Sequence, residues 1–277
     1  MKIKILSILL TTFAILLIII ALIPFYWIVL CSIRPYSTLY TTEVALIPTN
    51  ITIDAFQRVL FESKFFIWLR NSLIVYIITL FVCMLVTLPA SYSFSRFEFL
   101  GKKTLLSSYF ILSQIMSGMS VIGLIALYTL LMKLKLINSL ITLGFVYAAY
   151  NVPFISWYLK TYFDTLPKNF DEAAFVDGAS FIQNLRYVVL PIAKPGIIVA
   201  IIFITIITWS EWVIASMLLG SENFTLAVGL VSLQVRWETP WNLFAATSIL
   251  YALPIIIVFI IAQRYLKSGL TLGGIKG

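Results

Sequence analysis

Several apolar stretches dominate this chain of 277 residues, and each is longer than a buried helix of a soluble protein needs to be. A helix requires about 20 apolar residues to cross the hydrocarbon core of a bilayer. A backbone in lipid must satisfy its own hydrogen bonds, and these stretches are far too long for the strands of a barrel. We therefore predict an all-α membrane protein, a single transmembrane domain over residues 1–277, with about six spans near residues 5–33, 69–95, 104–132, 137–159, 195–219 and 241–264.

The composition supports this fold class and argues against catalysis. Hydrophobic residues make up 61% of the chain and charged residues 11%, whereas soluble domains average about 25% charged residues. The chain contains no histidine, which removes the commonest general base and the commonest metal ligand. Its two cysteines, Cys31 and Cys83, lie inside apolar stretches and fit packing positions. We expect no catalytic residue, no metal site and no bound cofactor in this chain.

The positions of the charged residues predict the orientation in the lipid bilayer. The first apolar run is too long for a secretory signal, whose apolar region covers about 7–15 residues, so we expect it to remain as a span. With six spans and a cytoplasmic N-terminus, most lysines and arginines fall in cytoplasmic segments, as the positive-inside rule requires. Both termini are therefore predicted to be cytoplasmic. This bias accounts for the net charge of +8 without a nucleic-acid partner.

The longest predicted cytoplasmic segment, residues 160–194, begins with the pattern of a short helix. Asn169 is placed to cap this helix, and Asp171 and Glu172 would interact favourably with the positive end of its dipole. Gly178 offers the left-handed residue that commonly ends a helix. The pattern predicts a helix that ends at a glycine hinge.

A second short helix is expected after the hinge. Ser180 and Gln183 have the spacing of a capping box, and Pro191 is expected to terminate the helix. The two helices together carry more apolar side chains than so short a segment can bury within itself. One interpretation is that part of these side chains packs on the cytoplasmic ends of the spans and part docks in a groove on a soluble partner. The other is that the helices lie on the lipid headgroups.

The loop resembles a known family motif. Residues 172–179 read EAAFVDGA and are followed by Leu-Pro at 190–191, which resembles the EAA loop of ABC importer permeases. In that family the loop forms a coupling helix that sits in a cleft of the ATP-hydrolysing subunit. The resemblance therefore implies a coupling loop over 160–194 with ATPase contacts at Glu172, Ala173, Ala174, Asp177 and Gly178.

Other segments resemble the carbohydrate-uptake branch of these permeases, among them WSEW at 209–212 and FTLAVGL at 224–230. The predicted cytoplasmic tail, residues 265–277, ends in SGLTLGGIKG and resembles the tail of the maltose-type second permease subunit, which reaches the interface between two ATPase subunits. The resemblance implies ATPase contacts for Gly273, Gly274 and Lys276. Without it, the tail would be interpreted as a disordered terminus.

The resemblance also implies an importer of several subunits. The chain lacks the GxxxxGK[ST] phosphate loop, so ATP and Mg²⁺ are expected on a partner ATPase dimer and not here. A second permease subunit and an extracytoplasmic solute-binding protein would complete the complex in the plasma or inner membrane of a bacterium or archaeon. This chain would be a permease subunit, not an enzyme, and its solute a sugar or oligosaccharide.

Four residues are candidates for the translocation path. Glu211 is an acid within the fifth predicted span, where a charge is costly unless it faces a cavity or a polar partner. Thr208 lies one helical turn earlier on the same face. Glu211 equally fits a position near the outer interface, in contact with neighbouring helices or headgroups. Trp212 fits sugar stacking or the aromatic belt, and Asn71 fits sugar binding or a bridge between helices.

Three other functions remain open at this stage. An importer for a non-sugar solute would share the same features. A secondary transporter would be expected to show internal repeats and interrupted helices with ligands for a coupling ion, and none is recognisable. A membrane enzyme would need a nucleophile with a base, or a metal set, and the sequence supplies neither.

Overall fold

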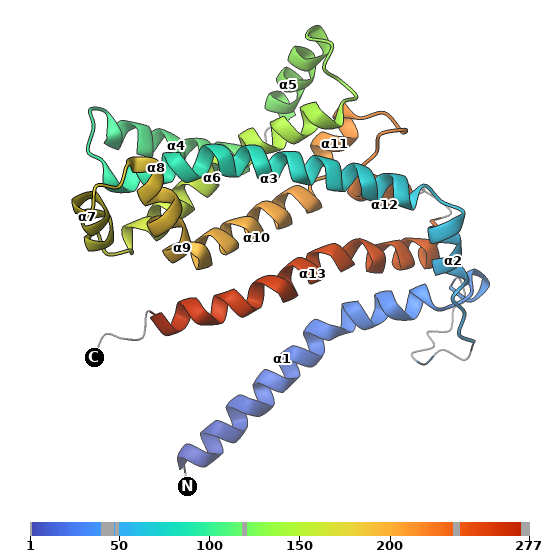
Figure 1. The fold of residues 1–277 in the computed structure, drawn as a ribbon. Helices are drawn as coiled ribbons and strands as arrows, with labels where there is room; N and C mark the ends of the chain where they lie inside the picture. The colour runs from blue at the N-terminus through green and yellow to red at the C-terminus, as the bar shows by residue number, and fades with distance from the viewer. Residues whose placement is uncertain (1, 40–46, 48–49, 118–120, 235–238, 273–277) are drawn as a thin grey trace. The chain divides into compact units, whose positions relative to one another are not determined.

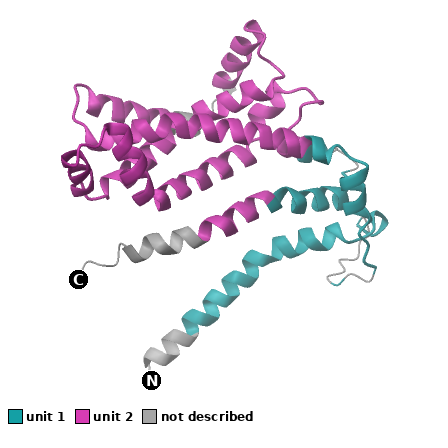
Figure 2. Ribbon diagram, viewed as in Figure 1, with its two compact units in different colours: residues 1–67, 229–253 teal, residues 68–228, 254–277 magenta. Residues whose placement is uncertain are grey.

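The computed structural model describes residues 2–39, 47, 50–117, 121–234 and 239–272. Regular structure within these residues is helical throughout, which confirms the predicted all-α fold class. Figure 2 colours two compact units, one of residues 1–67 and 229–253 and the other of residues 68–228 and 254–277.

The first unit contains the first long helix of the chain. α1 (Lys2–Ser32) includes the apolar stretch Leu9–Ser32, which is long enough to cross a membrane and exposes nearly all of its side chains. Apolar surface on this scale is stable only in lipid or against another protein. The same unit holds α2 (Asp54–Phe61), a short amphipathic helix that buries Ala55 and Val59.

The second unit is built around three long helices that run side by side in Figure 1. They are α3 (Phe65–Arg96), α6 (Leu140–Asp164) and α10 (Lys194–Ser210). Their backbones approach closely because hydroxyl and glycine residues meet between them; the Thr79 hydroxyl donates a hydrogen bond to the Gly144 carbonyl at 3.1 Å. The shared apolar core comprises Cys83, Tyr92, Ala148, Ile155, Leu159, Phe163, Val189, Ala193, Ala200 and Ile204.

Shorter helices complete the second unit. α4 (Lys102–Ser117) packs against α6, and α5 (Val121–Lys133) contacts α11 (Val213–Leu218). A second apolar cluster joins α3, α5, α6 and α11 and comprises Val75, Leu131, Leu143, Tyr147, Ile214, Ala215, Leu218, Leu219 and Val228. Two further helices, α12 (Leu226–Ser232) and α13 (Trp241–Leu272), each continue from one unit into the other.

Four helices among the described residues are long and apolar enough to cross a membrane. They are Leu9–Ser32, Phe65–Arg96, Leu140–Asp164 and Trp241–Gln263, and they lie over the predicted spans 5–33, 69–95, 137–159 and 241–264. A fifth results if the bent pair Phe181–Ile192 and Lys194–Ser210 is counted as one span. The count of six spans stays a prediction.

The two remaining predicted spans are not single helices. The stretch 104–132 is divided between α4 and α5, and the residues between these helices lie outside the described part. The stretch 195–219 contains α10, which ends at Ser210, and then the separate helix α11. This second break falls at Glu211, whose backbone is extended, with φ −76° and ψ 120°.

Candidate functional site

The segment between α6 and α10 folds as the helix, glycine, helix arrangement expected from its sequence. Gly178 follows α7 with φ +82°, the left-handed conformation that glycine adopts without strain. The elements of the segment are α7 (Asn169–Val176), α8 (Phe181–Asn184), the π-helical turn η2 (Leu185–Val189) and α9 (Leu190–Ile192).

The predicted capping box is confirmed. The Ser180 amide donates to the Gln183 side-chain oxygen at 2.7 Å, and the Gln183 amide donates to the Ser180 hydroxyl at 3.4 Å. These two bonds satisfy amides that the first turn of α8 would otherwise leave unpaired. The direction in which the chain leaves the glycine hinge is therefore set locally.

The predicted N-terminal cap of α7 is wrong. Asn169 is the first residue inside the helix, and the N-cap position is occupied by Lys168. The helix starts instead from the Lys168 carbonyl, which accepts hydrogen bonds from the amides of Asp171 at 2.9 Å and Glu172 at 3.1 Å. The helix begins one residue earlier than the cap pattern indicated because Lys168 already has helical dihedral angles, φ −68° and ψ −20°.

The predicted termination at Pro191 is also wrong, because the helix continues to Ile192. In the π-helical turn before the proline, the Leu190 amide bonds to the Leu185 carbonyl, so a new helical segment starts at Leu190. Pro191 then occupies the first turn of that segment, where a missing amide costs little. The chain bends by 80° after Ile192, between α9 and α10.

The predicted coupling residues do not all face outward. The side chains of Glu172, Ala173 and Asp177 are exposed, as is Gly178, and they lie within two turns of one another. Ala174 is only 8% exposed and belongs to the buried side of α7. Four of the five residues are therefore accessible to a partner.

The accessible side of this segment is unusually apolar. Phe170, Phe175 and Val176 on α7 are 49%, 43% and 87% exposed, and Ile182 on α8 is exposed as well. Such side chains normally leave water by binding a protein or a membrane surface. The geometry provides an apolar, acid-bearing surface next to a glycine hinge.

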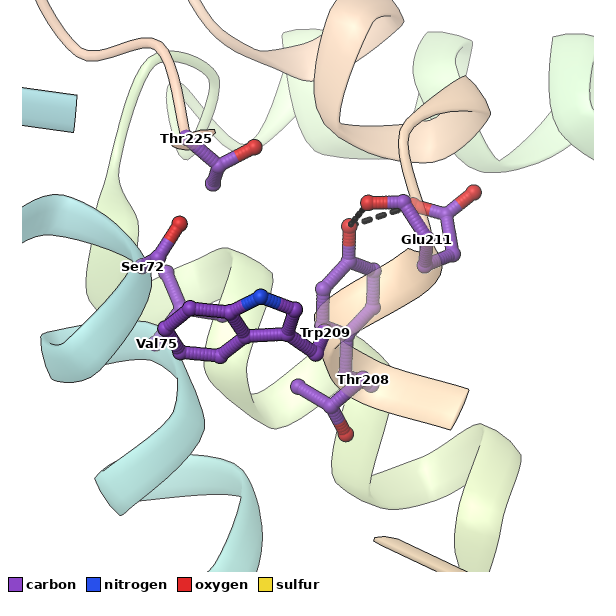
Figure 3. A pocket seen from close by; sticks show the side chains of 7 residues that line it. Ser72, Val75, Thr208, Trp209, Glu211 and Thr225 are labelled. Atoms are coloured by element: carbon purple, nitrogen blue, oxygen red, sulfur yellow. Dashed lines mark hydrogen bonds between the residues drawn. The ribbon is translucent and has the colours of Figure 1, made fainter. Parts of the chain in front are cut away.

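The candidate path residues lie in a different part of the same unit. Thr208 and Glu211 line a small pocket with Trp209, and Figure 3 shows them there with Ser72, Val75 and Thr225. The Tyr147 hydroxyl, also in this pocket, donates a hydrogen bond to the Glu211 carboxylate. The Thr208 hydroxyl is buried and has no hydrogen-bond partner among the residues that the structure describes.

Glu211 also organises the start of α11. Its carboxylate accepts hydrogen bonds from the backbone amides of Ile214 at 2.9 Å and Ala215 at 3.3 Å. These are amides of the first helical turn, which have no partner within the helix. The carboxylate is therefore paired with protein groups, and one of its roles in the structure is that of a helix cap.

The other two candidates do not line this pocket. Trp212 is exposed, and it is not among the residues that line the pocket. Asn71 is fully buried: its side-chain nitrogen donates to the Phe224 carbonyl at 3.1 Å, and its oxygen accepts from Arg70 at 3.2 Å. Asn71 thus joins α3 to the loop before α12, which corresponds to the bridging alternative.

Comparison with known proteins identifies the family. The model of the family "Binding-protein-dependent transport system inner membrane component" matches residues 101–271. The chain belongs to this family.

Several relatives of this permease are similar along most of their length. The trehalose/maltose transport system permease protein MalG of Thermococcus litoralis is 33% identical over 95% of this chain and 95% of the relative. The inner membrane ABC transporter permease protein YcjP of Escherichia coli is 30% identical, covering 94% and 92% respectively. The maltodextrin permease protein MdxG of Bacillus subtilis is 34% identical, covering 82% and 81%. These relatives are transport permease subunits.

A solved structure has the same fold as this permease. It belongs to a bacterial ABC transporter involved in the import of the acidic polysaccharide alginate, and it matches with a TM-score of 0.78 over 95% of this chain and 96% of that chain. The sequences are 23% identical, so the likeness concerns the fold. With its apolar helices, the permease is a multi-pass protein of the inner membrane.

One group of residues in this permease was not predicted as part of a site. Asp171, directly before Glu172, is 6% exposed and forms an ion pair with Arg96 of α3, with 2.8 Å between Oδ2 and Nε. Its other oxygen accepts hydrogen bonds from the Tyr92 hydroxyl at 2.6 Å and the Asn184 side chain at 2.8 Å. The available signals were two adjacent acids in a helix rich in apolar residues and a cation at the end of an apolar run.

A second unpredicted group centres on Asn138, in the turn before α6. Its backbone is left-handed, with φ +60°, and its side-chain oxygen accepts hydrogen bonds from the Gly220 amide at 2.9 Å and the Asn223 side chain at 3.0 Å. The Asn138 amide donates to the Leu218 carbonyl at 2.8 Å. This turn therefore holds the loop that follows α11.

The predicted tail contacts fall outside the part of the chain that the structure describes. Gly273, Gly274 and Lys276 lie outside the described residues, beyond the end of α13 at Leu272. Their assignment stays a prediction.

Proposed function

We propose that this chain is a transmembrane permease subunit of an ATP-binding cassette importer and that it translocates a sugar or oligosaccharide. Its relatives support a carbohydrate because their names specify trehalose and maltose, maltodextrin, and diacetylchitobiose. An extracytoplasmic binding protein would deliver the solute, in keeping with the family's description as a component of binding-protein-dependent transport. A second permease subunit would complete the transmembrane pathway.

The observation that carries the coupling proposal is the exposed apolar surface of α7. Phe170, Phe175 and Val176 stand on this surface beside the acids Glu172 and Asp177. We assign it to a cleft of the partner ATPase, which would hydrolyse Mg²⁺-bound ATP on its own residues. The ATPase would bind two conformers of the permease with different affinity. Its movement would therefore shift the permease from one conformer to the other.

The proposed topology has six crossings with both termini in the cytoplasm. It places the coupling loop, with its own Lys168, on the same side as Arg96, Lys102 and Lys103, as the positive-inside rule favours. The tail, including Gly273, Gly274 and Lys276, would extend toward the ATPase subunits. The pocket lined by Thr208 and Glu211 is the proposed contribution to the solute path.

Co-purification from membranes tests this function. Wild-type permease is expected to bring with it an ATPase, a second permease and a binding protein. Glu172→Lys should reduce the recovered ATPase because it reverses a charge on the docking surface. Glu98→Lys is the matched control, since Glu98 is a highly exposed acid that lies outside the loop, between α3 and α4.

Each result has a defined meaning. Equal recovery of the ATPase with Glu172→Lys and Glu98→Lys would remove the coupling surface from the proposal. Recovery of the permease alone, with uptake driven by an ion gradient in the absence of ATP, would identify a secondary transporter instead.

The solute class is tested separately with the reconstituted complex. ATP-driven uptake of radiolabelled maltose, trehalose, maltotriose or diacetylchitobiose into liposomes would support a carbohydrate importer. ATP-driven uptake of an amino acid or an inorganic ion, with none of these sugars taken up, would instead support the alternative of a non-sugar importer.

A further inference from the structure

α7 is held to the rest of the permease by very few buried atoms. Of its eight residues, only Asp171 and Ala174 are buried, while Phe170 and Phe175 are about half exposed and Val176 is 87% exposed. The methyl group of Ala174 contributes little contact area. The Asp171 carboxylate and its partners therefore form the buried polar attachment of α7 to the bundle.

These partners come from two other elements. Tyr92 and Arg96 lie one turn apart at the end of α3, and both contact Asp171. Asn184 lies on α8, beyond the glycine hinge, and its side-chain nitrogen donates both to Asp171 and to the Tyr92 hydroxyl, each at 2.8 Å. One carboxylate thus ties both arms of the loop to the same end of α3.

Aromatic rings and a backbone contact support this polar cluster. The Tyr92 ring lies 6.0 Å from the Phe163 ring of α6 and 5.4 Å from the Phe181 ring of α8. Arg96 also donates to the Leu166 carbonyl at 3.1 Å, at the start of the loop. The guanidinium and the carboxylate are both at least nine-tenths buried, so neither can exchange its partner for water without moving.

The Arg96–Asp171 pair differs from other ion pairs at this end of the bundle. Glu98, paired with Lys102, and Asp164, paired with Lys160, have side chains that are 89% and 40% exposed. Such pairs can break into solvent at little cost. Removing one member of the Arg96–Asp171 pair would leave a buried charge without a partner.

We propose that Asp171, Arg96, Tyr92 and Asn184 form the joint through which movement of the coupling loop is transmitted to α3. The inference rests on the proposed function. Asp171 acts as a positioning residue: it does not face the ATPase, but it makes α7 and α3 move together when the ATPase moves α7. Without the joint, α7 would shift over the bundle while α3 stayed in place.

The test uses the complete transporter, with its ATPase, second permease and binding protein, reconstituted in liposomes. Asp171→Asn keeps the shape of the side chain but removes its charge, and Asp171→Asn with Arg96→Gln removes both charges. Tyr92→Phe is a milder variant that deletes one hydrogen bond. Glu98→Gln is the matched control, because it neutralises an exposed carboxylate at the same end of α3.

Two measurements test whether these residues form the joint. The first is the amount of sugar accumulated per ATP hydrolysed, using the sugar that the wild type takes up. We expect Asp171→Asn to lower this ratio by about 5-fold or more, the lower range of allosteric couplings, while Glu98→Gln leaves it unchanged. Tyr92→Phe should lower it less, and the double variant should recover part of the loss.

The second measurement does not depend on the sugar. Spin labels are placed on exposed Lys168, at the start of α7, and on exposed Phe81 of α3. In the wild type the distance between the labels should stay the same with and without ATP and vanadate. In Asp171→Asn and, to a smaller extent, in Tyr92→Phe, the distance should change or its distribution broaden.

The outcomes separate this inference from the proposed function. A wild-type complex that lacks an ATPase refutes the proposed function itself. Normal ATPase recovery with an unchanged sugar-to-ATP ratio and an unchanged label distance in both Asp171→Asn and Tyr92→Phe refutes the joint. A parallel fall of hydrolysis and uptake, with no change in the label distance, would show that the cluster serves stability alone and would also overturn the proposal.

Discussion

The ring of Tyr162 in α6 covers the α-carbon of Gly196 in α10 so closely that no side chain fits between them. A β-carbon placed on Gly196 would lie 2.4 Å from Cδ1 of the ring, well inside van der Waals contact. Both residues lie near the bend between α9 and α10. The absence of a side chain at position 196 therefore sets how closely these helices pack at the base of the loop.

Gly196→Ala should destabilise the permease. Overpacking of a dense core typically costs about 1–3 kcal/mol, and here the ring must move because its body, not a flexible end, blocks the new methyl group. The midpoint of thermal unfolding in detergent is expected to fall. Adding Tyr162→Ala should make the Gly196→Ala substitution nearly neutral in the double-mutant cycle; additive losses would contradict the packing explanation.

Substitution of Gly178 should act through the backbone alone. Its φ is +82°, and a β-carbon there would meet no atom within 4 Å. A left-handed conformation costs a β-branched residue such as valine roughly 1–2 kcal/mol, whereas asparagine tolerates it better. Gly178→Val should reduce ATPase recovery and uptake more than Gly178→Asn. Equal effects of the two substitutions would indicate that glycine is needed for close approach of a partner rather than for its conformation.

Substitutions of Glu211 distinguish a helix cap from a solute contact. Loss of a capping side chain typically costs about 1 kcal/mol, and Glu211→Ala removes the acceptor for the amides of Ile214 and Ala215. Glu211→Gln keeps an acceptor oxygen and should be less destabilising. If uptake falls with Glu211→Gln while the midpoint of thermal unfolding is unchanged, the carboxylate charge acts on the solute path. Normal uptake by Glu211→Gln would instead assign Glu211 to the helix cap alone.

Substitution of Asn138 should destabilise the permease, because this residue supplies both a left-handed backbone and side-chain hydrogen bonds. Asn138→Gly keeps the left-handed backbone but loses the side-chain hydrogen bonds with Gly220, Glu222 and Asn223, each worth a net ~1 kcal/mol. Asn138→Ala loses the same bonds and adds backbone strain of about 1–2 kcal/mol. Thermal unfolding should therefore rank wild type above glycine and glycine above alanine. Equal stability of the Asn138→Ala and Asn138→Gly variants would show that the turn relaxes out of the strained backbone conformation.

The local features of the coupling loop were predictable because each depends on residues close together in the chain. The glycine at 178 and the capping box of Ser180 and Gln183 follow from short-range backbone chemistry, and the structure has both. The errors at Asn169 and Pro191 are also local. In each, a neighbouring backbone carbonyl, that of Lys168 or Leu185, took a hydrogen bond that side-chain patterns do not encode.

The candidate path residues show where local patterns are insufficient. Thr208 and Glu211 share a helical spacing, and the structure does bring them to one pocket, but Glu211 does so from an extended backbone after the helix has ended. The burial of Asn71 against the Phe224 carbonyl joins residues 153 positions apart. Such a contact has no signature near Asn71 itself.

By itself, the sequence determined that this chain is helical and membrane-embedded, because apolar length and backbone hydrogen bonding in lipid admit no other fold for such stretches. It also determined the glycine hinge and the motif that indicated the family. Only the tertiary structure decided which acid of the loop faces outward and which is buried. Glu172 and Asp171 are adjacent and chemically alike, yet Asp171 meets Tyr92, 79 residues away, and Arg96. Burial of a charge depends on where its partner is in space, and that position is set by the packing of α3 against the loop.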